Sequence, residues 1–286
     1  MDDIAIAIEH VDKAVAHFEA AGSGFVAFRV GPNPGVVALA VSGLFRWMAG
    51  FAEGAVGRTQ RALRLARELD HPPSIAYALH HANIVDLWRM DAPSVTSRAT
   101  ELLGLAETHG YPIWQALALV FRGAATVQSG DVHAGLAEID KGFELYNELA
   151  TPPIFWPTVL TIRATAYGAA GQFERALELM RESEANVRDQ DPLRDDLAIA
   201  HGDLFLTLPS PDQTAAEARF DRAAVIAGSR RARMIELQAL TRLVSVRSGD
   251  PQEDTLQQLR QLYEWFTEGF DTPQLAAARG LLEANR

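Results

Sequence analysis

The sequence contains no cysteine and only two lysines, Lys13 and Lys141, among its 286 residues. The absence of cysteine excludes disulfides, thiolate zinc sites and a cysteine nucleophile in one step. Arginine supplies nearly all of the positive charge, and the formal net charge at pH 7 is −11. A chain of this charge repels a phosphate backbone on average, so we expect no nucleic acid as its principal partner.

The signatures of common catalytic sites are also missing. Neither lysine follows a glycine, so no Gly-rich loop ending in Gly-Lys-Ser/Thr is present to hold a nucleotide phosphate. A cyclase needs acidic residues on neighbouring strands to bind metal ions, and no alternating strand pattern carries them. Residues 22–24 (Gly-Ser-Gly) lack the spacing of a nucleophile elbow. We therefore predict a chain without enzymatic activity, cofactor or metal.

Export and membrane signals are weak. Asp2 and Asp3 stand where a secretory signal would carry basic residues, so we expect a cytoplasmic protein. Residues 35–52 are apolar except for Ser42 and Arg46, and their number is near the lower limit for a membrane span. Arg46 would cost about 2.5 to 3.5 kcal/mol at the centre of a bilayer helix. We interpret this segment as a buried repeat helix and expect no membrane association.

The sequence does contain an internal repeat. Turns between helical patterns fall at a period of about 40 residues, near Gly50, Met90, Gly130, Gly171, Ser210 and Gly249. After each of the first five turns, the second helix carries three core residues at spacings of four and three, typically small, large and small, such as Ala176, Met180 and Ser183. Such a period indicates stacked helical hairpins. We count Gly171 as position 15 of a tetratricopeptide (TPR) unit. Ala164 and Ala176 then occupy positions 8 and 20, where that repeat uses small residues.

We predict an all-α fold, a right-handed TPR-like α-solenoid that forms a single domain over residues 1–286. An orphan helix at 1–21 carries the triplet Ala7, Val11 and Ala14, as expected of a second helix without its first helix. Six hairpins follow at about 35–69, 74–109, 113–149, 155–188, 194–228 and 232–267, and a helix at 272–284 caps the array. Proline-containing connectors near 31–35, 70–73, 110–112, 150–153 and 190–192 separate the repeats. Arg122 and Arg163 occupy position 7, where leucine is usual, so we expect different packing there.

Candidate binding residues follow from the same register, because outward positions of the first helices line the concave surface of such arrays. They are Trp47, Tyr77, His80, Ile84, Leu117, Val120, Thr158, Thr161 and Thr165, with Trp114 and Trp156 at or just before helix starts. Large aromatic side chains are enriched at binding hot spots, although each also suits a core position. His80 and His81 point about 100° apart on a helix, which favours a structural or groove-lining role over a shared metal ion.

Three segments carry a resemblance to a known group of proteins. They are RVGPNPGVV at 29–37, RALRLARELDHP at 61–72 and YEWFTEGFDT at 263–272. These resemble the C-terminal TPR region of bacterial multidomain regulators, in which a class III adenylate/guanylate cyclase or transcriptional regulator precedes an NTPase domain and the helical array. The resemblance covers nearly the whole chain, with the last segment the most specific. It implies a regulatory or interaction region whose partners include the upstream catalytic domains.

The leading functional hypothesis is a non-enzymatic regulatory scaffold in bacterial signal transduction that binds a protein or peptide. The alternative is a sensor that binds a small molecule or peptide in the concave groove, and a third possibility is self-association through the ends of the array. The sequence makes no prediction of oligomeric state. The initial Met1 is compatible with a stand-alone protein or with a fragment of a longer one.

Overall fold

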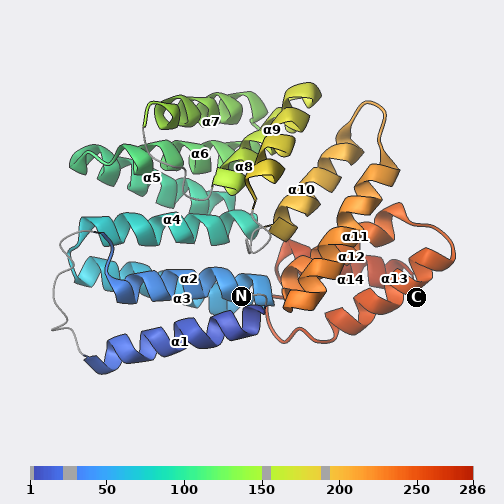
Figure 1. Ribbon diagram of the computed structural model, residues 1–286, viewed down its shortest axis with the longest axis horizontal. Coiled ribbons are helices and arrows are strands. Elements are labelled where there is room, and N and C mark those ends of the chain that lie inside the picture. Colours follow the sequence, from blue (N-terminus) through green and yellow to red (C-terminus); the bar gives the residue numbers. More distant parts are fainter. Residues whose placement is uncertain (1–2, 22–30, 150–155, 188–193, 286) are drawn as a thin grey trace. The chain divides into compact units, whose positions relative to one another are not determined.

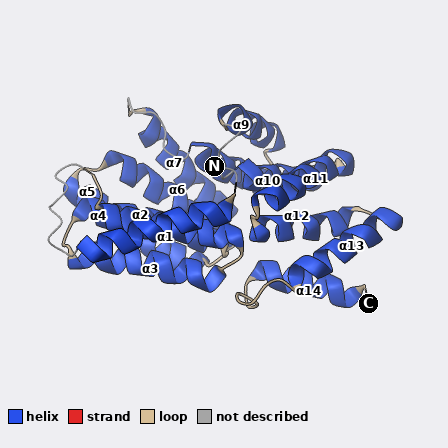
Figure 2. Cartoon of the chain, turned by 60° about the horizontal axis from the view of Figure 1, so that its bottom comes forward, coloured by secondary structure: helices blue, strands red, loops and turns tan. Residues whose placement is uncertain are grey.

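The computed structural model describes residues 3–21, 31–149, 156–187 and 194–285. Every regular element in these ranges is an α-helix, and fourteen helices follow one another along the chain (Figures 1 and 2). They comprise one initial helix, six helical hairpins and one closing helix. The all-α, helical-repeat prediction is therefore confirmed.

The helices have the following limits. The initial helix is α1 (Ile4–Ala21) and the closing helix is α14 (Pro273–Ala284). The hairpins pair α2 (Pro34–Ala49) with α3 (Ala52–Glu68), α4 (Pro72–Trp88) with α5 (Ala92–His109), and α6 (Pro112–Gln128) with α7 (Val132–Asn147). They continue with α8 (Trp156–Ala169) and α9 (Phe173–Asn186), α10 (Arg194–Thr207) and α11 (Gln213–Arg230), and α12 (Arg233–Val246) and α13 (Asp250–Tyr263).

Local signals explain where the helices begin and end. Prolines stand in the first turn of α4 and α6, where a missing backbone N–H costs no hydrogen bond. The side chains of Asp91 and Asp131 cap α5 and α7 by accepting hydrogen bonds from backbone N–H groups. Gly130 and Gly171 turn the chain with φ of 100° and 74°, whereas Met90 makes the equivalent turn with φ of 57°. The predicted connectors at 150–153 and 190–192 lie wholly outside the described residues.

The chain divides into two compact units, which we describe separately. The N-terminal unit comprises Ala5–Trp47 and Ala52–Pro152, and so holds nearly all of α1 to α7. The C-terminal unit comprises Pro153–Arg286 with the short pieces Met1–Ile4 and Met48–Phe51. The single domain expected from the sequence stays a prediction.

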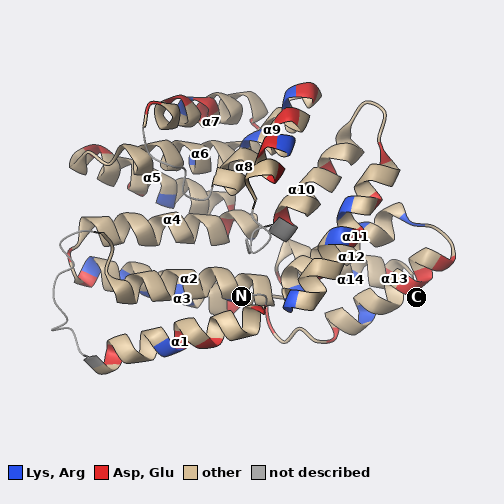
Figure 3. Cartoon of the chain, viewed as in Figure 1, with Lys and Arg blue, Asp and Glu red and all other residues tan. Residues whose placement is uncertain are grey.

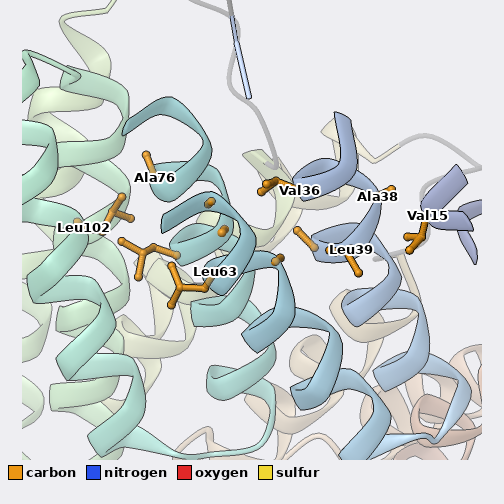
Figure 4. Close-up of a cluster of buried hydrophobic side chains, with 13 residues drawn as sticks. Val15, Val36, Ala38, Leu39, Leu63, Ala76 and Leu102 are labelled. Atoms are coloured by element: carbon orange, nitrogen blue, oxygen red, sulfur yellow. The ribbon is translucent and has the colours of Figure 1, made fainter. Parts of the chain in front are cut away.

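The core of the N-terminal unit draws one or more apolar side chains from each helix from α1 to α6. Figure 4 shows Val15 of α1, Leu39 of α2, Leu63 of α3, Ala76 of α4 and Leu102 of α5 within one buried cluster. Each of these side chains is at most 8% exposed. Stacked hairpins bury their apolar faces only against their neighbours, so this continuous cluster is what holds the repeats together.

Glycine brings α6 and α7 into close contact. A Cβ atom added to Gly135 would lie 2.5 Å from the carbonyl oxygen of Gly123, and one added to Gly123 would lie 2.5 Å from that of Gly135. A Cβ atom on Gly142 would lie 2.7 Å from the carbonyl oxygen of Ala116. The backbones of the two helices therefore touch at positions where no larger residue fits.

Charged residues of both signs occur along α1 (Figure 3), and their side chains attach this helix to the first hairpin. Asp12 pairs with Arg46 of α2 at 2.6 Å and with Arg58 of α3 at 3.1 Å, and Glu19 pairs with Arg61 of α3. Arg46, the charge inside the apolar segment, is thus paired within the N-terminal unit. Among the described residues, no helix combines the length and apolar character that a membrane span requires.

Arg247 joins three helices of the C-terminal unit. It follows the end of α12 and pairs with Glu217 and Asp221 of α11 at 2.7 and 2.5 Å. Its Nη1 also donates a hydrogen bond to Thr255 Oγ1 of α13 at 2.9 Å. A single guanidinium, with its fork of donors, thereby ties one hairpin to the next.

Candidate interaction surface

Most of the predicted concave positions of the N-terminal unit are buried. His80 and Leu117 are 1% exposed, and Ile84 and Val120 are 2% exposed. The His80 ring lies 5.3 Å, centroid to centroid, from both Trp114 and Phe121. The first helices α4 and α6 therefore pack directly against each other, and these positions fill the space between them.

The remaining predicted aromatic residues of this unit also belong to packed surroundings. Trp47 is 1% exposed at the end of α2. Tyr77 and Trp114 are partly buried and pack against the hydrophobic cluster around Leu39 and Leu102. The structure thus brings Tyr77, His80 and Trp114 into one region. Their role as contact residues, and that of Trp47 and Leu117, stays a prediction.

Burial keeps the histidine pair of α4 neutral. It lowers the pKa of His81 to about 4 and holds the pKa of His80 well below its ordinary value of 6.5. The neutral His81 ring stacks on Tyr77 at 4.1 Å, and its Nδ1–H donates to the Tyr77 carbonyl at 2.9 Å. The His80 and His81 rings are inclined at 81° to each other and face different neighbours. Within the described ranges, no three potential His, Asp or Glu ligands converge.

Two further buried polar residues of α4 escaped the sequence prediction. Asp86 is 3% exposed and pairs with Arg98 of α5. Asn83 is completely buried, and neither atom of its amide has a hydrogen-bond partner in the described part of the chain. A signal existed in the sequence: with Met90 as position 15, Asn83 occupies position 8, where Gly123 and Ala164 stand in other hairpins.

The other predicted contact residues lie on α8 in the C-terminal unit. Thr165 is exposed, whereas Trp156, Thr158 and Thr161 are partly exposed. The Thr161 and Thr165 hydroxyls donate to the backbone carbonyls of Pro157 and Thr161 at 2.7 and 2.9 Å. These bonds use each hydroxyl proton inside the helix, which leaves oxygen lone pairs and methyl groups for a partner.

The two arginines at position 7 find different neighbours. Arg163 lies over the ring of Tyr167 on α8, with its guanidinium carbon 5.5 Å from the ring centroid. Arg122 of α6 donates from Nε to Glu138 Oε1 of α7 at 2.6 Å. Together with the threonines, Arg163 and Tyr167 make α8 a partly exposed, mixed polar and aromatic helix. We call residues 158, 161 and 165, which lie within about 60° of one another around the helix, the α8 face.

An unpredicted polar contact joins three neighbouring helices of the same unit. His201 of α10 is 2% exposed, and its Nδ1 lies 2.9 Å from Glu184 Oε1 of α9. Arg219 of α11 pairs with the same carboxylate. Burial alone would raise the pKa of Glu184, but the hydrogen bond to His201 and the nearby arginines hold it below its ordinary value. The carboxylate stays ionised and links the three helices.

Comparisons with known proteins establish the fold. No family model matches the chain. An uncharacterized protein of Rhizobium meliloti strain 1021, R02095, is 24% identical over 153 residues, which are 54% of this chain and 15% of that protein. The chain therefore matches a small part of a much longer relative. The crystal structure of the apo form of RapI superposes with a TM-score of 0.56 and 11% identity, over 97% of this chain and 93% of that chain. This likeness, with the fourteen helices described above, assigns the chain a TPR-like helical-repeat fold.

Proposed function

We propose that this chain is a non-catalytic scaffold that binds a protein or peptide partner through the α8 face. The observation that supports the proposal most directly is the exposure of α8. It is a first helix whose outward threonines are partly exposed or exposed, whereas His80 and Ile84 of α4 and Leu117 and Val120 of α6 are buried. Helical-repeat arrays commonly bind partners through such first-helix surfaces.

We further propose that the scaffold belongs to a larger cytoplasmic signalling protein with cyclase or NTPase domains. The three segments that resemble such regulators support this proposal. The long relative supports it as well, because 153 matched residues that make up 15% of a protein imply a total length of about a thousand residues. A polypeptide of that length has room for several domains besides a helical array.

The sensor alternative has less support. A groove that holds a small molecule needs concave residues that a ligand can reach. In the N-terminal unit those positions, including His80 and Leu117, are filled by helix-to-helix packing. We therefore favour a macromolecular partner over a small metabolite.

A peptide selection tests the α8 face. A randomised peptide library displayed on phage is selected against the chain, and converging peptides are then measured against Thr165→Arg and against Arg175→Ala, an exposed residue of α9. We expect Thr165→Arg to weaken binding by about tenfold or more, because a long charged side chain would cover the face. Arg175→Ala should bind as the parent chain does. Peptides that never converge, or that bind both variants equally, would contradict the proposal.

A further inference from the structure

The connection between α13 and α14 exposes aromatic side chains that lie outside the α8 face. We call residues 264–272 the aromatic loop, which follows Tyr263 of α13 and precedes Pro273 of α14. Trp265 is 41% exposed and Phe270 is 42% exposed, although large aromatic side chains usually contribute to a core or an interface. Single exposed apolar residues are ordinary, but two large rings on one short loop indicate an interaction surface.

Buried residues hold the aromatic loop in place. Phe266 is 4% exposed, and a Cβ atom on Gly50, which belongs to the same compact unit, would lie 2.8 Å from its ring. Thr272 is 5% exposed, and its Oγ1 donates a hydrogen bond to the Gly269 carbonyl at 2.7 Å. The loop is therefore packed at its centre and at its end, and a loose conformation does not explain its exposed rings.

A ring contact closes the loop and brings its aromatic residues into one area. The Tyr263 and Phe270 rings lie 5.9 Å apart, centroid to centroid, in an edge-to-face arrangement. Trp265 follows Tyr263 by two residues, which limits the distance between their Cα atoms to about 7 Å. Both exposed rings therefore come from one small area of the surface.

The charged residues of the aromatic loop are all acidic. Glu264 and Asp271 are exposed and flank the two rings in the sequence, and Glu268 lies between the rings. The nearest basic residues along the chain are Arg260 and Arg279. The loop thus combines exposed aromatic faces with carboxylates, and both attract a cation.

A guanidinium of the chain itself already contacts one of the rings. The Cζ atom of Arg233 lies 6.0 Å from the centroid of the Trp265 ring. Arg233 also pairs with Glu236 at 2.7 Å, so its charge is balanced within α12. Trp265 remains 41% exposed with this contact in place, and it therefore keeps surface for a second cation.

We propose that the aromatic loop binds a segment of a partner protein that is rich in arginine or lysine. Cations of that segment lie over Trp265 and Phe270 and pair with the carboxylates of Glu264 and Asp271. The same carboxylates repel an anionic membrane, a nucleic acid and a second copy of this chain, whose net charge is −11. The aromatic loop shares no residue with the α8 face, so the inference goes beyond the function proposed above.

Fluorescence anisotropy with a defined probe tests the proposal. The probe is a fluorescein-labelled peptide of arginine–glycine repeats, and its control carries citrulline in place of arginine, which removes the charge but keeps the shape. We expect Trp265→Ala and Phe270→Ala each to weaken binding of the arginine peptide by about threefold or more, because each removes a ring for a cation. Val225→Ala on α11, which removes a side chain that is 72% exposed, should bind as the parent chain does.

A charge-matched pair of double variants separates the loop from the net charge. Glu264→Gln with Asp271→Asn should weaken binding of the arginine peptide by about threefold or more, since two pairing carboxylates are lost. Glu107→Gln with Glu144→Gln changes the net charge equally at exposed positions of α5 and α7, and should leave the binding nearly unchanged. The citrulline peptide should bind every variant weakly.

Several results would overturn the proposal. Equal weakening by the loop variants and their controls would show attraction to net charge alone, and equal binding of both peptides would show that no cation is recognised. Attachment to phosphatidylserine vesicles or self-association in light scattering, if either depended on Trp265, would identify another occupant. If Trp265→Ala loses its helical circular dichroism, Phe270→Ala and the charge variants still decide the outcome. Thr165→Arg should leave arginine-peptide binding unchanged, so either proposal can fail without the other.

Discussion

Met90 turns the chain between α4 and α5 in a left-handed conformation, with φ of 57° and with 57% of its surface exposed. A non-glycine residue in this conformation loses about 1 kcal/mol or more relative to glycine. We expect Met90→Gly to raise the free energy of unfolding by about 0.5 to 1 kcal/mol, after the greater freedom of glycine in the unfolded chain is subtracted. Urea denaturation of Met90→Gly and of Met90→Ala, which keeps the strain, provides the comparison. Equal stability of the two variants would contradict this account.

Because two histidines of α4 are buried, we expect the free energy of unfolding to decrease at acidic pH. An unfolded histidine titrates near 6.5, whereas folded His81 titrates at about 4, so the unfolded chain binds more protons between these values. The free energy of unfolding should therefore be steady above pH 6.5 and decrease as the pH drops from 6.5 towards 4. His80 adds to the same decrease because burial also lowers its pKa.

Replacing His81 isolates its share of this pH dependence. His81→Gln should flatten the decrease by up to about 1.4 kcal/mol per pH unit, since one proton fewer is taken up on unfolding. The exposed His10, replaced by Gln, is the control for substitution of a histidine outside the core. Chemical denaturation at several pH values between 4 and 7 gives both slopes. An unchanged slope in His81→Gln would contradict the neutral buried state.

The hairpin of α6 and α7 depends on two glycines that face each other. Gly135→Ala should lower the free energy of unfolding by about 1 to 3 kcal/mol, because the added methyl group would sit 2.5 Å from the Gly123 carbonyl oxygen. Gly104 of α5 is the matched control, since a Cβ atom there meets nothing within 4 Å. Gly104→Ala should stabilise the chain by about 0.5 to 1 kcal/mol, as alanine favours helix. In thermal or urea denaturation, the midpoint of Gly135→Ala should fall below that of the parent chain, and the midpoint of Gly104→Ala should rise above it.

The helices themselves were predictable from the sequence because their signals are local. Prolines, capping aspartates and turn glycines such as Gly130 and Gly171 act within a few residues, so the period of about 40 residues located all six hairpins. The burial of the concave positions was not predictable in the same way. Whether His80 meets Trp114 or a partner depends on how closely two successive first helices approach, and that distance is set by packing between repeats.

The candidate site was predictable only in part for a similar reason. The register places Thr161 and Thr165 on the outward side of α8, and the structure leaves Thr161 partly exposed and Thr165 exposed. It also places Asn83 at a position where small residues are usual, but no pattern indicates that its amide is buried without a partner. Contacts between distant helices, such as His201 with Glu184, have no short-range signal at all.

The two compact units allow a test of cooperativity across the whole molecule. In a helical-repeat array each hairpin contacts only its neighbours. A substitution that destabilises one hairpin therefore affects the nearby hairpins more than the distant ones. We expect Gly135→Ala to increase amide hydrogen exchange in α4 to α7 and to leave α11 to α13 protected under native conditions. Mass spectrometry of exchanged peptides gives the comparison. A uniform increase throughout both units would instead support the single domain predicted from the sequence.

The contact between Gly123 and Gly135 also constrains how the gene can change. Any amino-acid replacement at either position adds a side chain where two backbones meet, and no replacement at the other position removes the collision. Only a simultaneous separation of α6 from α7 would relieve it. Among descendants that keep this hairpin, both codons should therefore remain glycine together, while the codon for Gly104 drifts freely.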